Sequence, residues 1–262
     1  MKRLLILKAV LLITVYGQLG NADVGKIKNY KVKVAVIDTG IDPALMASNT
    51  FCDSGHKDFT NTSLKDNHGH GTHVSGLIDQ YAKNFLFIRN GKIPKDVNDI
   101  DKINVNYCQI ILKFYDPKAV GSDNLKNTIK AFEWAIANKV DIINYSGGGA
   151  EFSQAEHDVV VRALNAGIKV VAAAGNERSD IDKHKYYPAM YDKRIYIVGN
   201  LVDTNSRQIA SSSNRGKSVN TWELGTNILS RLPNNSFGFM TGTSQATAVK
   251  SGKLVREMLL HH

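Results

Sequence analysis

Ser244 is the residue of this 262-residue sequence whose setting first suggests chemistry. It stands in Gly-Thr-Ser-Gln-Ala, residues 242–246, and a helical pattern follows from Gln245 to Leu260. A serine hydroxyl is a weak nucleophile, so it needs a base within hydrogen-bonding reach and donors for the negative charge that it creates. A helix N-terminus favours such an anion. Serine is also a preferred N-cap of any helix, so this stretch alone favours the capping role.

A candidate base lies in residues 67–76, Asn-His-Gly-His-Gly-Thr-His-Val-Ser-Gly, which begin a helical pattern that runs to about Ala82. One interpretation of His68, His70 and His73 is a single catalytic imidazole among glycines that let the backbone approach closely. The other is a metal site, because His-x-His-x-x-His resembles the ligand motif of the metallo-β-lactamases. That motif carries an aspartate directly before its last histidine, where this chain has Thr72, so the metal site is the weaker interpretation.

The elements around these residues alternate between strand and helix. After residue 31 the chain shows strand-like apolar runs that alternate with helical patterns of apolar residues. The expected strands are 31–38, 110–115, 140–145, 168–174 and 195–198, and the expected helices are 67–82, 125–138, 154–165 and 245–260. This alternation predicts an α/β fold, a doubly wound and mostly parallel sheet with helices on both faces. Residues 84–107 are less regular and are expected to form a surface excursion.

Further polar residues follow the expected strands directly. Asp38 ends the first strand, Ser146-Gly147-Gly148-Gly149 follow the third, and Gly175-Asn176 follow the fourth. An aspartate in a turn is most often only a turn former. However, open α/β sheets place their sites at the carboxyl ends of the strands. There Asp38 could orient and stabilise an imidazole, the imidazole could take the serine proton, and Asn176 could donate to an oxyanion.

The chain order of the Asp, His and Ser residues narrows the enzyme classes that this arrangement could represent. Chymotrypsin-like enzymes run His, Asp, Ser, and α/β-hydrolases run Ser, Asp, His, whereas this chain runs Asp, His, Ser. At this point the sequence resembles the subtilisin-like serine proteases, the subtilase family, over residues 31–257. The resemblance is carried by four motifs: VIDTGID (36–42), HGHGTHVSG (68–76), AAAGN (172–176) and GTSQA (242–246). It implies a serine endopeptidase acting through an acyl-enzyme, with Asp38, His70 and Ser244 as the triad and Asn176 in the oxyanion hole. His68 is then expected to be an exposed loop residue, and His73 to pack or hydrogen-bond within its helix.

The resemblance also implies how a polypeptide substrate is bound. The residues it places along the substrate are Ser146, Gly147, Gly148, Gly149, Ala174, Gly175 and Glu177. The glycine-rich segment corresponds to an exposed strand edge that pairs with an extended peptide. Gly147 replaces a larger apolar residue and opens one wall of the primary specificity pocket, whereas Tyr186 or Tyr187 narrows its base. Glu177 at the rim of the pocket attracts a basic side chain of the substrate, but the positive charge of Arg178 beside it opposes this attraction. The sequence therefore does not predict which substrate side chain is preferred.

The chain also departs from the family pattern. Ala47 stands where an aspartate ligand of a calcium site is expected, so structural calcium is possible but its ligands are unknown, and the chemistry requires no cofactor. Lys250 stands where an apolar residue is usual, and the domain is short at its C-terminus. The stretch between Ala22 and Asp38 leaves no room for an inhibitory propeptide, so a separate folding helper or inhibitor is a possible partner.

Composition and the N-terminus suggest where the protein acts. Residues 1–22 have a basic start, an apolar run and Gly20-Asn21-Ala22, as a secretory signal has, which leaves 23–262 as a single catalytic domain. Three of the charges behind the net +9 lie in that segment, which leaves +6 for the rest, with no Lys/Arg block typical of nucleic-acid binding. The apolar run is too short for a stable membrane span. We expect a secreted or periplasmic protein, whose Cys52 and Cys108 form either a disulfide or two buried thiols.

Overall fold

The computed structural model describes residues 30–85 and 97–261. The expected signal segment and residues 86–96 of the expected excursion lie outside the described residues. The helices in chain order are α2 (His70–Ala82), α3 (Asn124–Ala137), α4 (Gln154–Asn165) and α5 (Thr243–Leu260), with short 3-10 helices η1 (Pro43–Leu45) and η2 (Val97–Lys102). The strands are β1 (Val32–Asp38), β2 (Lys57–Asp58), β3 (Tyr107–Lys113), β4 (Ile142–Tyr145), β5 (Lys169–Ala173), β6 (Tyr196–Asp203), β7 (Gln208–Ile209), β8 (Thr221–Leu224), β9 (Ile228–Leu232) and β10 (Ser236–Met240).

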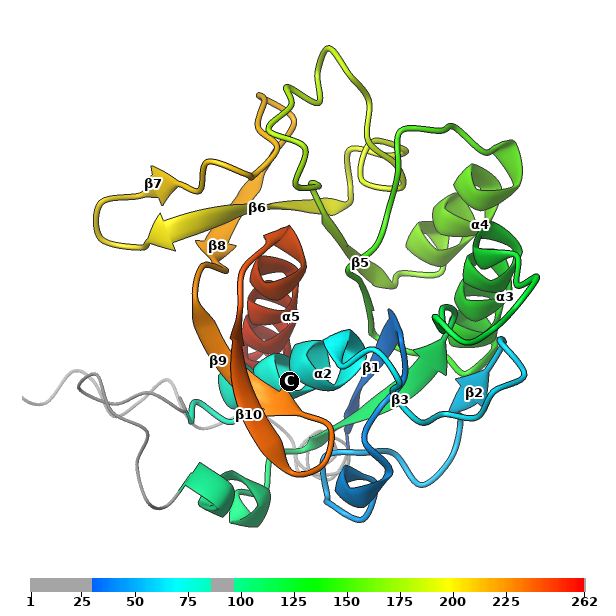
Figure 1. Cartoon of the computed structure of the whole chain (residues 1–262), viewed down its shortest axis with the longest axis vertical. Coiled ribbons are helices and arrows are strands. Elements are labelled where there is room, and N and C mark those ends of the chain that lie inside the picture. The colour runs from blue at the N-terminus through cyan, green and yellow to red at the C-terminus, as the bar shows by residue number, and fades with distance from the viewer. Residues whose placement is uncertain (1–29, 86–96, 262) are drawn as a thin grey trace, which may run out of the picture.

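The main sheet is doubly wound, as predicted (Figure 1). Its strand order is β2-β3-β1-β4-β5-β6-β7, and β8 also pairs with β6. All of these pairings are parallel except β6 with β7. β1 lies between β3 and β4, in a register that sets Asp38 beside Lys113. The carboxyl end of β1 therefore lies at the middle of one edge of the sheet, where the chain reverses its winding direction.

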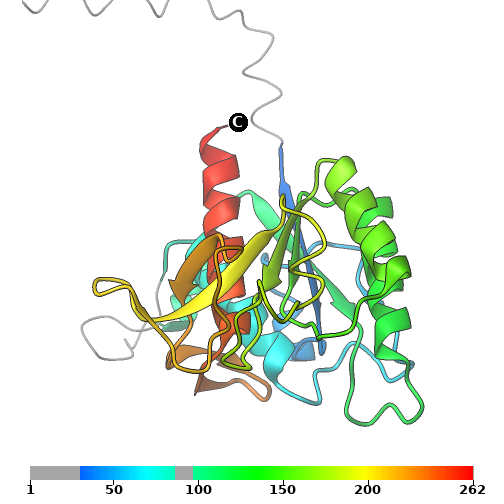
Figure 2. The ribbon, with the colours of Figure 1, turned by 90° about the horizontal axis from the view of Figure 1, so that it is seen from above.

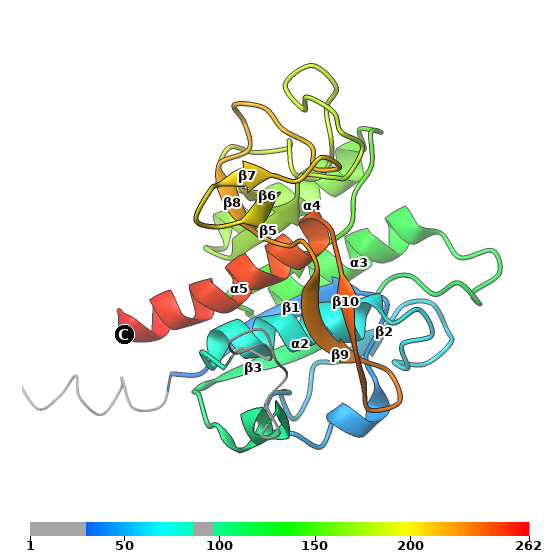
Figure 3. The same ribbon diagram turned by 60° about the vertical axis from the view of Figure 1, so that its left-hand side comes forward.

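Helices cover both faces of this sheet, because alternate residues of each buried strand point to opposite sides. Ala35 and Ile37 of β1 belong to a core with α3 and α4, whereas Val34 and Val36 belong to a second core with α2 and α5. Figure 2 shows the two helix pairs on either side of the strands, and Figure 3 shows α2 and α5 next to each other, as their contacts require. The predicted fold class, with helices on both faces, is confirmed.

The helices of the two faces begin differently. Asp123 caps α3 by accepting from Lys126 N, and Ser153 caps α4 by accepting from Glu156 N. α2 and α5 begin after Gly69 and Gly242, which have no side chain to act as a cap. The first backbone N–H groups of α2 and α5 are therefore left for other partners.

The sequence patterns predict no strand at β2, β7, β8, β9 or β10. β9 and β10 form an antiparallel hairpin, whose turn holds Asn234 and Asn235 at φ 64° and 53°, and the hairpin lies against α2. Asparagine tolerates this left-handed conformation, so Asn-Asn was the local signal of the turn. Cys52 and Cys108 form a disulfide, which the sequence had left as one of two alternatives. Within the described residues, no helix is long and apolar enough to cross a bilayer.

Candidate active site

The structure brings Asp38 and His70 together at the carboxyl end of β1. Asp38 is the last residue of β1 and His70 is the first residue of α2. His70 Nδ1 donates a hydrogen bond of 2.7 Å to Asp38 Oδ1, and Asp38 is only 3% exposed. With its proton held at Nδ1, the neutral imidazole leaves Nε2 as a proton acceptor. Burial acts to lower the pKa of His70, but the charge of Asp38, its hydrogen bond and the charge of Asp66 outweigh burial and raise it.

Asp66 fixes the start of α2 and was not singled out from the sequence. Its Oδ1 accepts from Thr39 Oγ1 at 2.9 Å and from Gly69 N at 2.7 Å. Its Oδ2 accepts from Thr72 N at 2.8 Å and Thr72 Oγ1 at 2.7 Å. One buried carboxylate thus ties the end of β1 to the first turn of α2 and takes the place of a side-chain cap. The available signal was an acidic residue just before a helix N-terminus.

A buried ion pair holds the loop that precedes this helix. Lys113 Nζ lies 2.5 Å from Asp116 Oδ2, and neither side chain is exposed. The same ammonium donates to the carbonyl oxygens of Ser63 and Lys65, at 2.9 and 2.6 Å. Since Lys113 is beside Asp38 in the β1–β3 register, this pair connects the sheet directly to the loop that leads to His70.

Ser244 is the second residue of α5 and faces the segment after β4. Its Oγ donates to Ser146 O at 2.9 Å, and Ser146 Oγ donates back to Ser244 O at 3.1 Å. In the part of the chain that the structure describes, no hydrogen bond joins Ser244 Oγ to His70. Proton transfer to His70 would require the serine side chain to rotate, as catalytic hydrogen bonds often tighten only when substrate is bound.

Asn176 lies beside the first turn of α5. Its Oδ1 accepts from Thr243 N at 2.9 Å, and Gly175 N donates to Thr243 Oγ1 at 3.2 Å. Because the Thr243 N–H group needs an acceptor, this contact assigns the amide orientation and leaves Nδ2 as a donor. Asn176 is exposed, so that donor is accessible next to the N-terminus of α5.

The expected substrate-binding residues lie in two segments, 146–149 after β4 and 174–177 after β5. Gly149 is paired with Tyr187, with N–H···O distances of 2.9 and 2.7 Å in the two directions. Ala174 is fully buried in the α3/α4 core, and its carbonyl accepts from Asn214 Nδ2 at 2.8 Å. The Glu177 carboxylate accepts from the same Asn214 amide at 2.6 Å. In this second segment Asn176 and Glu177 are exposed, as is Arg178, which follows it.

The three histidines of the 68–73 cluster point to different partners. His68 is exposed, with its ring 6.1 Å from that of His70. His73 is fully buried and donates from Nε2 to Gly238 O at 3.1 Å, and burial lowers the pKa of His73 to about 4. Both expectations, an exposed His68 and a packed His73, are confirmed. Among the described residues, no group of three or more His, Cys, Asp or Glu side chains is arranged to hold a metal ion.

An ammonium group occupies the oxygen cluster at the end of α2, near the position where calcium was considered. Lys83 Nζ lies 3.1 Å from Asp79 Oδ1, 3.0 Å from Thr50 Oγ1, 3.1 Å from Ile100 O and 3.3 Å from Asn49 Oδ1. Hard cations such as calcium take oxygen ligands of these kinds. Because the Lys83 charge already fills this cluster, its oxygens do not fit a second cation.

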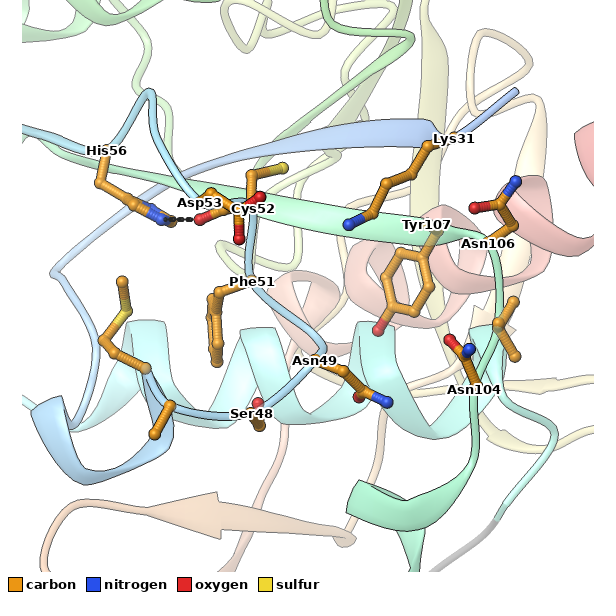
Figure 4. A pocket seen from close by; sticks show the side chains of 13 residues that line it. Lys31, Ser48, Asn49, Phe51, Cys52, Asp53, His56, Asn104, Asn106 and Tyr107 are labelled. Carbon is orange, nitrogen blue, oxygen red and sulfur yellow. Dashed lines mark hydrogen bonds between the residues drawn. The ribbon is translucent and has the colours of Figure 1, made fainter. Parts of the chain in front are cut away.

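A cavity lies at the opposite edge of the sheet. It has a volume of about 640 Å³ and is lined by residues at the amino ends of β1 and β3, including Lys31 and Tyr107. Figure 4 shows the Asn49, Asn104 and Asn106 side chains around it. None of the residues that line it belongs to the segments around Ser244, so this cavity is separate from the candidate active site.

Comparison with known proteins accords with this arrangement. Residues 29–257 match the model of the subtilase family. The chain belongs to the subtilase family. This subtilase is 34% identical over 220 residues to the minor extracellular protease Epr of Bacillus subtilis, covering 82% of this chain and 30% of Epr. It is 32% identical over 238 residues to the major intracellular serine protease of the same organism, and the match covers 87% of this chain and 68% of that protease.

A solved structure is also similar to this subtilase. The crystal structure of a cold-adapted subtilisin-like serine proteinase superposes with a TM-score of 0.66 at 25% identity, covering 88% of this chain and 76% of that one. The lengths differ more among the curated relatives. The chain spans 30% of Epr and about half, 54%, of subtilisin amylosacchariticus.

Proposed function

We propose that this subtilase is a serine endopeptidase that hydrolyses extended polypeptides through an acyl-enzyme, with Asp38, His70 and Ser244 as its triad. The observation that carries the proposal is the 2.7 Å bond from His70 Nδ1 to buried Asp38, at the sheet edge where α5 presents Ser244. That bond holds the tautomer that a general base needs. Membership of a family of serine proteases supports the same reaction.

In the proposed first step, the Ser244 hydroxyl leaves the Ser146 carbonyl and gives its proton to His70 Nε2 as Oγ attacks the scissile carbonyl carbon. Asp38 stabilises the resulting imidazolium. Asn176 Nδ2 and the Ser244 backbone N–H donate to the oxyanion, aided by the N-terminus of α5. His70 then returns the proton to the leaving amine. In the second step a water molecule, deprotonated by His70, hydrolyses the ester and frees Ser244.

The proposed substrate strand lies along Ser146, Gly147 and Gly148. Backbone pairing with an exposed edge gives affinity for any extended peptide, which suits an endopeptidase. Gly149 also belongs to this segment, but both its N–H and its carbonyl are paired with Tyr187. We therefore assign Gly149 to the support of the segment rather than to direct pairing with the peptide.

The proposed site of action is outside the cytoplasm, either secreted or periplasmic. Support comes from the signal-like residues 1–22 and from the extracellular relative, although another relative is named as intracellular. N-terminal sequencing of the protein recovered from culture medium and from cells tests this directly. A mature N-terminus close to Asp23 in the exported fraction is the expected result, and full-length protein confined to the cytoplasm would contradict it.

The proposed activity is tested by labelling the purified full chain with a fluorophosphonate and measuring its intact mass, with Ser244→Ala as the control. We expect one adduct per chain, located on Ser244 and insensitive to a chelator, and none on the variant. A folded protein that stays unlabelled would contradict an assembled triad. Labelling that disappears with the chelator would make the triad dependent on a metal ion.

The oxyanion role is tested with Asn176→Ala. Removing one such donor costs about 10²- to 10³-fold in kcat, the loss measured for a subtilisin. The variant should still form the fluorophosphonate adduct on Ser244, and the loss of the Thr243 N–H to Asn176 Oδ1 bond should lower its stability by only about 1 kcal/mol. A loss of less than about threefold would remove Asn176 from the proposed oxyanion hole.

A further inference from the structure

The space beside Ser244 has two walls, and this inference rests on the proposed acyl-enzyme. One wall is the segment after β4, joined to Ser244 by the reciprocal bonds with Ser146. The other is the segment after β5, joined to the first turn of α5 by the bond from Thr243 N to Asn176 Oδ1. β4 and β5 are paired in parallel, so the two segments leave the sheet side by side. The side chain of an acyl group on Ser244 must enter between them.

The ring of Tyr186 already lies between these walls. A Cβ added at Gly148 would lie 2.6 Å from Tyr186 Cε1, and one added at Gly175 would lie 2.8 Å from Tyr186 Cε2. Carbon atoms in contact are normally about 3.5 to 4.0 Å apart, so neither glycine could carry a side chain here. The two edges of one ring thus touch the two opposite walls, and the ring spans the space between them.

The backbone around Tyr186 is held in place. Its neighbour Tyr187 makes the two backbone bonds with Gly149, and Tyr186 O accepts from Met190 N at 2.9 Å. The Tyr187 ring is occupied elsewhere, stacked on Tyr191 with centroids 4.8 Å apart. Of the two tyrosines considered from the sequence, Tyr186 is therefore the one that narrows the space.

The charge of Glu177 does not change the conclusion that Tyr186 narrows the space beside Ser244. The Glu177 carboxylate is bonded to Asn214 on the Gly175 side, and it is exposed to solvent. Burial, with the charge of Glu177, raises the pKa of Tyr186 to about 12, so the phenol is neutral at physiological pH. A long basic side chain would have to displace the same ring before it could reach the depth of the space.

We infer that Tyr186 fills the primary specificity pocket and that this enzyme cleaves after small residues, such as alanine, and disfavours large aromatic and long basic ones. Gly148 and Gly175 contribute by lacking side chains, which lets the ring fit between the walls. A Cβ added at Gly147 would lie closest to the Tyr145 ring, at 3.0 Å, and not to Tyr186, so the expected opening of one wall at Gly147 stays a prediction.

The test is a kcat/KM series on N-acylated tetrapeptide p-nitroanilides that differ only in having Ala, Phe or Lys before the scissile bond. The wild-type chain should prefer Ala. In Tyr186→Gly the Phe/Ala ratio should rise about 100-fold, because the pocket then gains the volume of an aromatic ring. Tyr186→Phe is the matched control. Since it keeps the ring, its ratio of kcat/KM for the Phe substrate to kcat/KM for the Ala substrate should stay within about threefold of wild type.

Phe152→Ala serves as a second control. Phe152 is 55% exposed and packs on Tyr187 and Tyr191 in the neighbouring aromatic cluster, so its loss should change neither activity nor preference. A labelled wild-type enzyme that prefers Phe or Lys over Ala would overturn this inference alone, even if Tyr186→Gly does not fold. An unchanged ratio in folded Tyr186→Gly would do the same. Failure of Ser244 to take the fluorophosphonate would instead overturn the proposed function, and with it this inference.

Discussion

The two helix pairs that cover the sheet are built in different ways. On the α2/α5 side, 11 of the 13 residues of α2 are buried, and 11 of the 18 residues of α5. On the α3/α4 side, only 5 of 14 and 5 of 12 are buried. The first pair packs on the sheet, and its α2 is also covered by the β9–β10 hairpin, whereas the second pair is a surface layer with one apolar stripe per helix.

The buried residues of the two pairs also differ in kind. α2 buries His73, Asp79 and Gln80, and α5 buries Gln245 and Thr247, whereas α3 and α4 bury mainly alanine, valine, leucine and phenylalanine. Buried polar groups need partners, so the α2/α5 side is held by a specific set of hydrogen bonds. The helices that begin at the site are thus fixed in position, and the other two mainly exclude water from the sheet.

The largest expected effect comes from the aspartate that orients the imidazole. Asp38→Asn keeps the shape but favours the wrong tautomer of His70, so kcat should fall about 10⁴-fold, as in other triads. Asp123→Asn, at the cap of α3, is the matched control on the other helix pair and should leave kcat unchanged. Steady-state kinetics on folded variants measures both. Equal losses of kcat in the two variants would mean that the α2/α5 side does not position the site more than the α3/α4 side does.

A second contrast compares a buried ion pair with an exposed one. Lys83 and Asp79 of the α2 end are 1% and 6% exposed, whereas Arg162 and Glu133 between α4 and α3 are 59% and 51% exposed. Removing one partner of a buried pair costs about 3 to 5 kcal/mol, because a buried charge is left alone. An exposed pair contributes about 0.2 to 1 kcal/mol. Urea unfolding of Lys83→Met and Arg162→Met should show this difference.

The pH dependence of the Lys83→Met defect sharpens that comparison. Burial raises the pKa of Asp79, and the Lys83 charge, which opposes this, is absent from the variant. The folded variant then binds a proton that the unfolded chain releases at lower pH, so its stability falls as pH rises. The loss relative to wild type should be larger at pH 8 than at pH 5. A loss independent of pH would indicate that packing of the lysine stem dominates.

Two histidines of α2 should respond to pH differently. The pKa of His70 is raised, so kcat/KM should fall as pH drops through a value above about 6.5, the usual pKa of histidine. Below that value the loss should be about tenfold per pH unit, since one proton inactivates the base. His73, with a pKa of about 4, stays neutral in the pH range where His70 takes up its proton, so it adds no second protonation to the fall in kcat/KM. A slope of two in the pH–rate profile would contradict this assignment.

The smallest effect is expected at a cap of the outer pair. Ser153 accepts from Glu156 N at 3.3 Å at the start of α4. Ser153→Ala should destabilise the protein by about 1 kcal/mol, and kcat should not change. Ser211→Ala, at an exposed serine outside any helix, should stay within about 0.5 kcal/mol of wild type. Thermal unfolding resolves the two, and a cap variant with reduced kcat would show that α4 also positions the site.

Local patterns in the sequence determined most of the frame. Apolar runs with periods near two and 3.6 predicted β1, α2, α3, β4, α4 and α5 to within a few residues. The strand-helix alternation predicted the doubly wound sheet. The positions of Asp38, His70, Asn176 and Ser244 at strand ends and helix starts followed from the same patterns, because the carboxyl ends of parallel strands share one edge.

Only the tertiary structure decided the contacts between residues far apart in the chain. It paired Cys52 with Cys108, set the Asp66 carboxylate against both Thr39 and Thr72, and placed the Tyr186 ring between two glycine-containing segments. No periodicity marks such residues, because each acts on groups that the fold, rather than the local chain, brings near. The sequence therefore determined which residues could do chemistry and along which edge, whereas close packing between separate segments decided how they are held and what fits beside them.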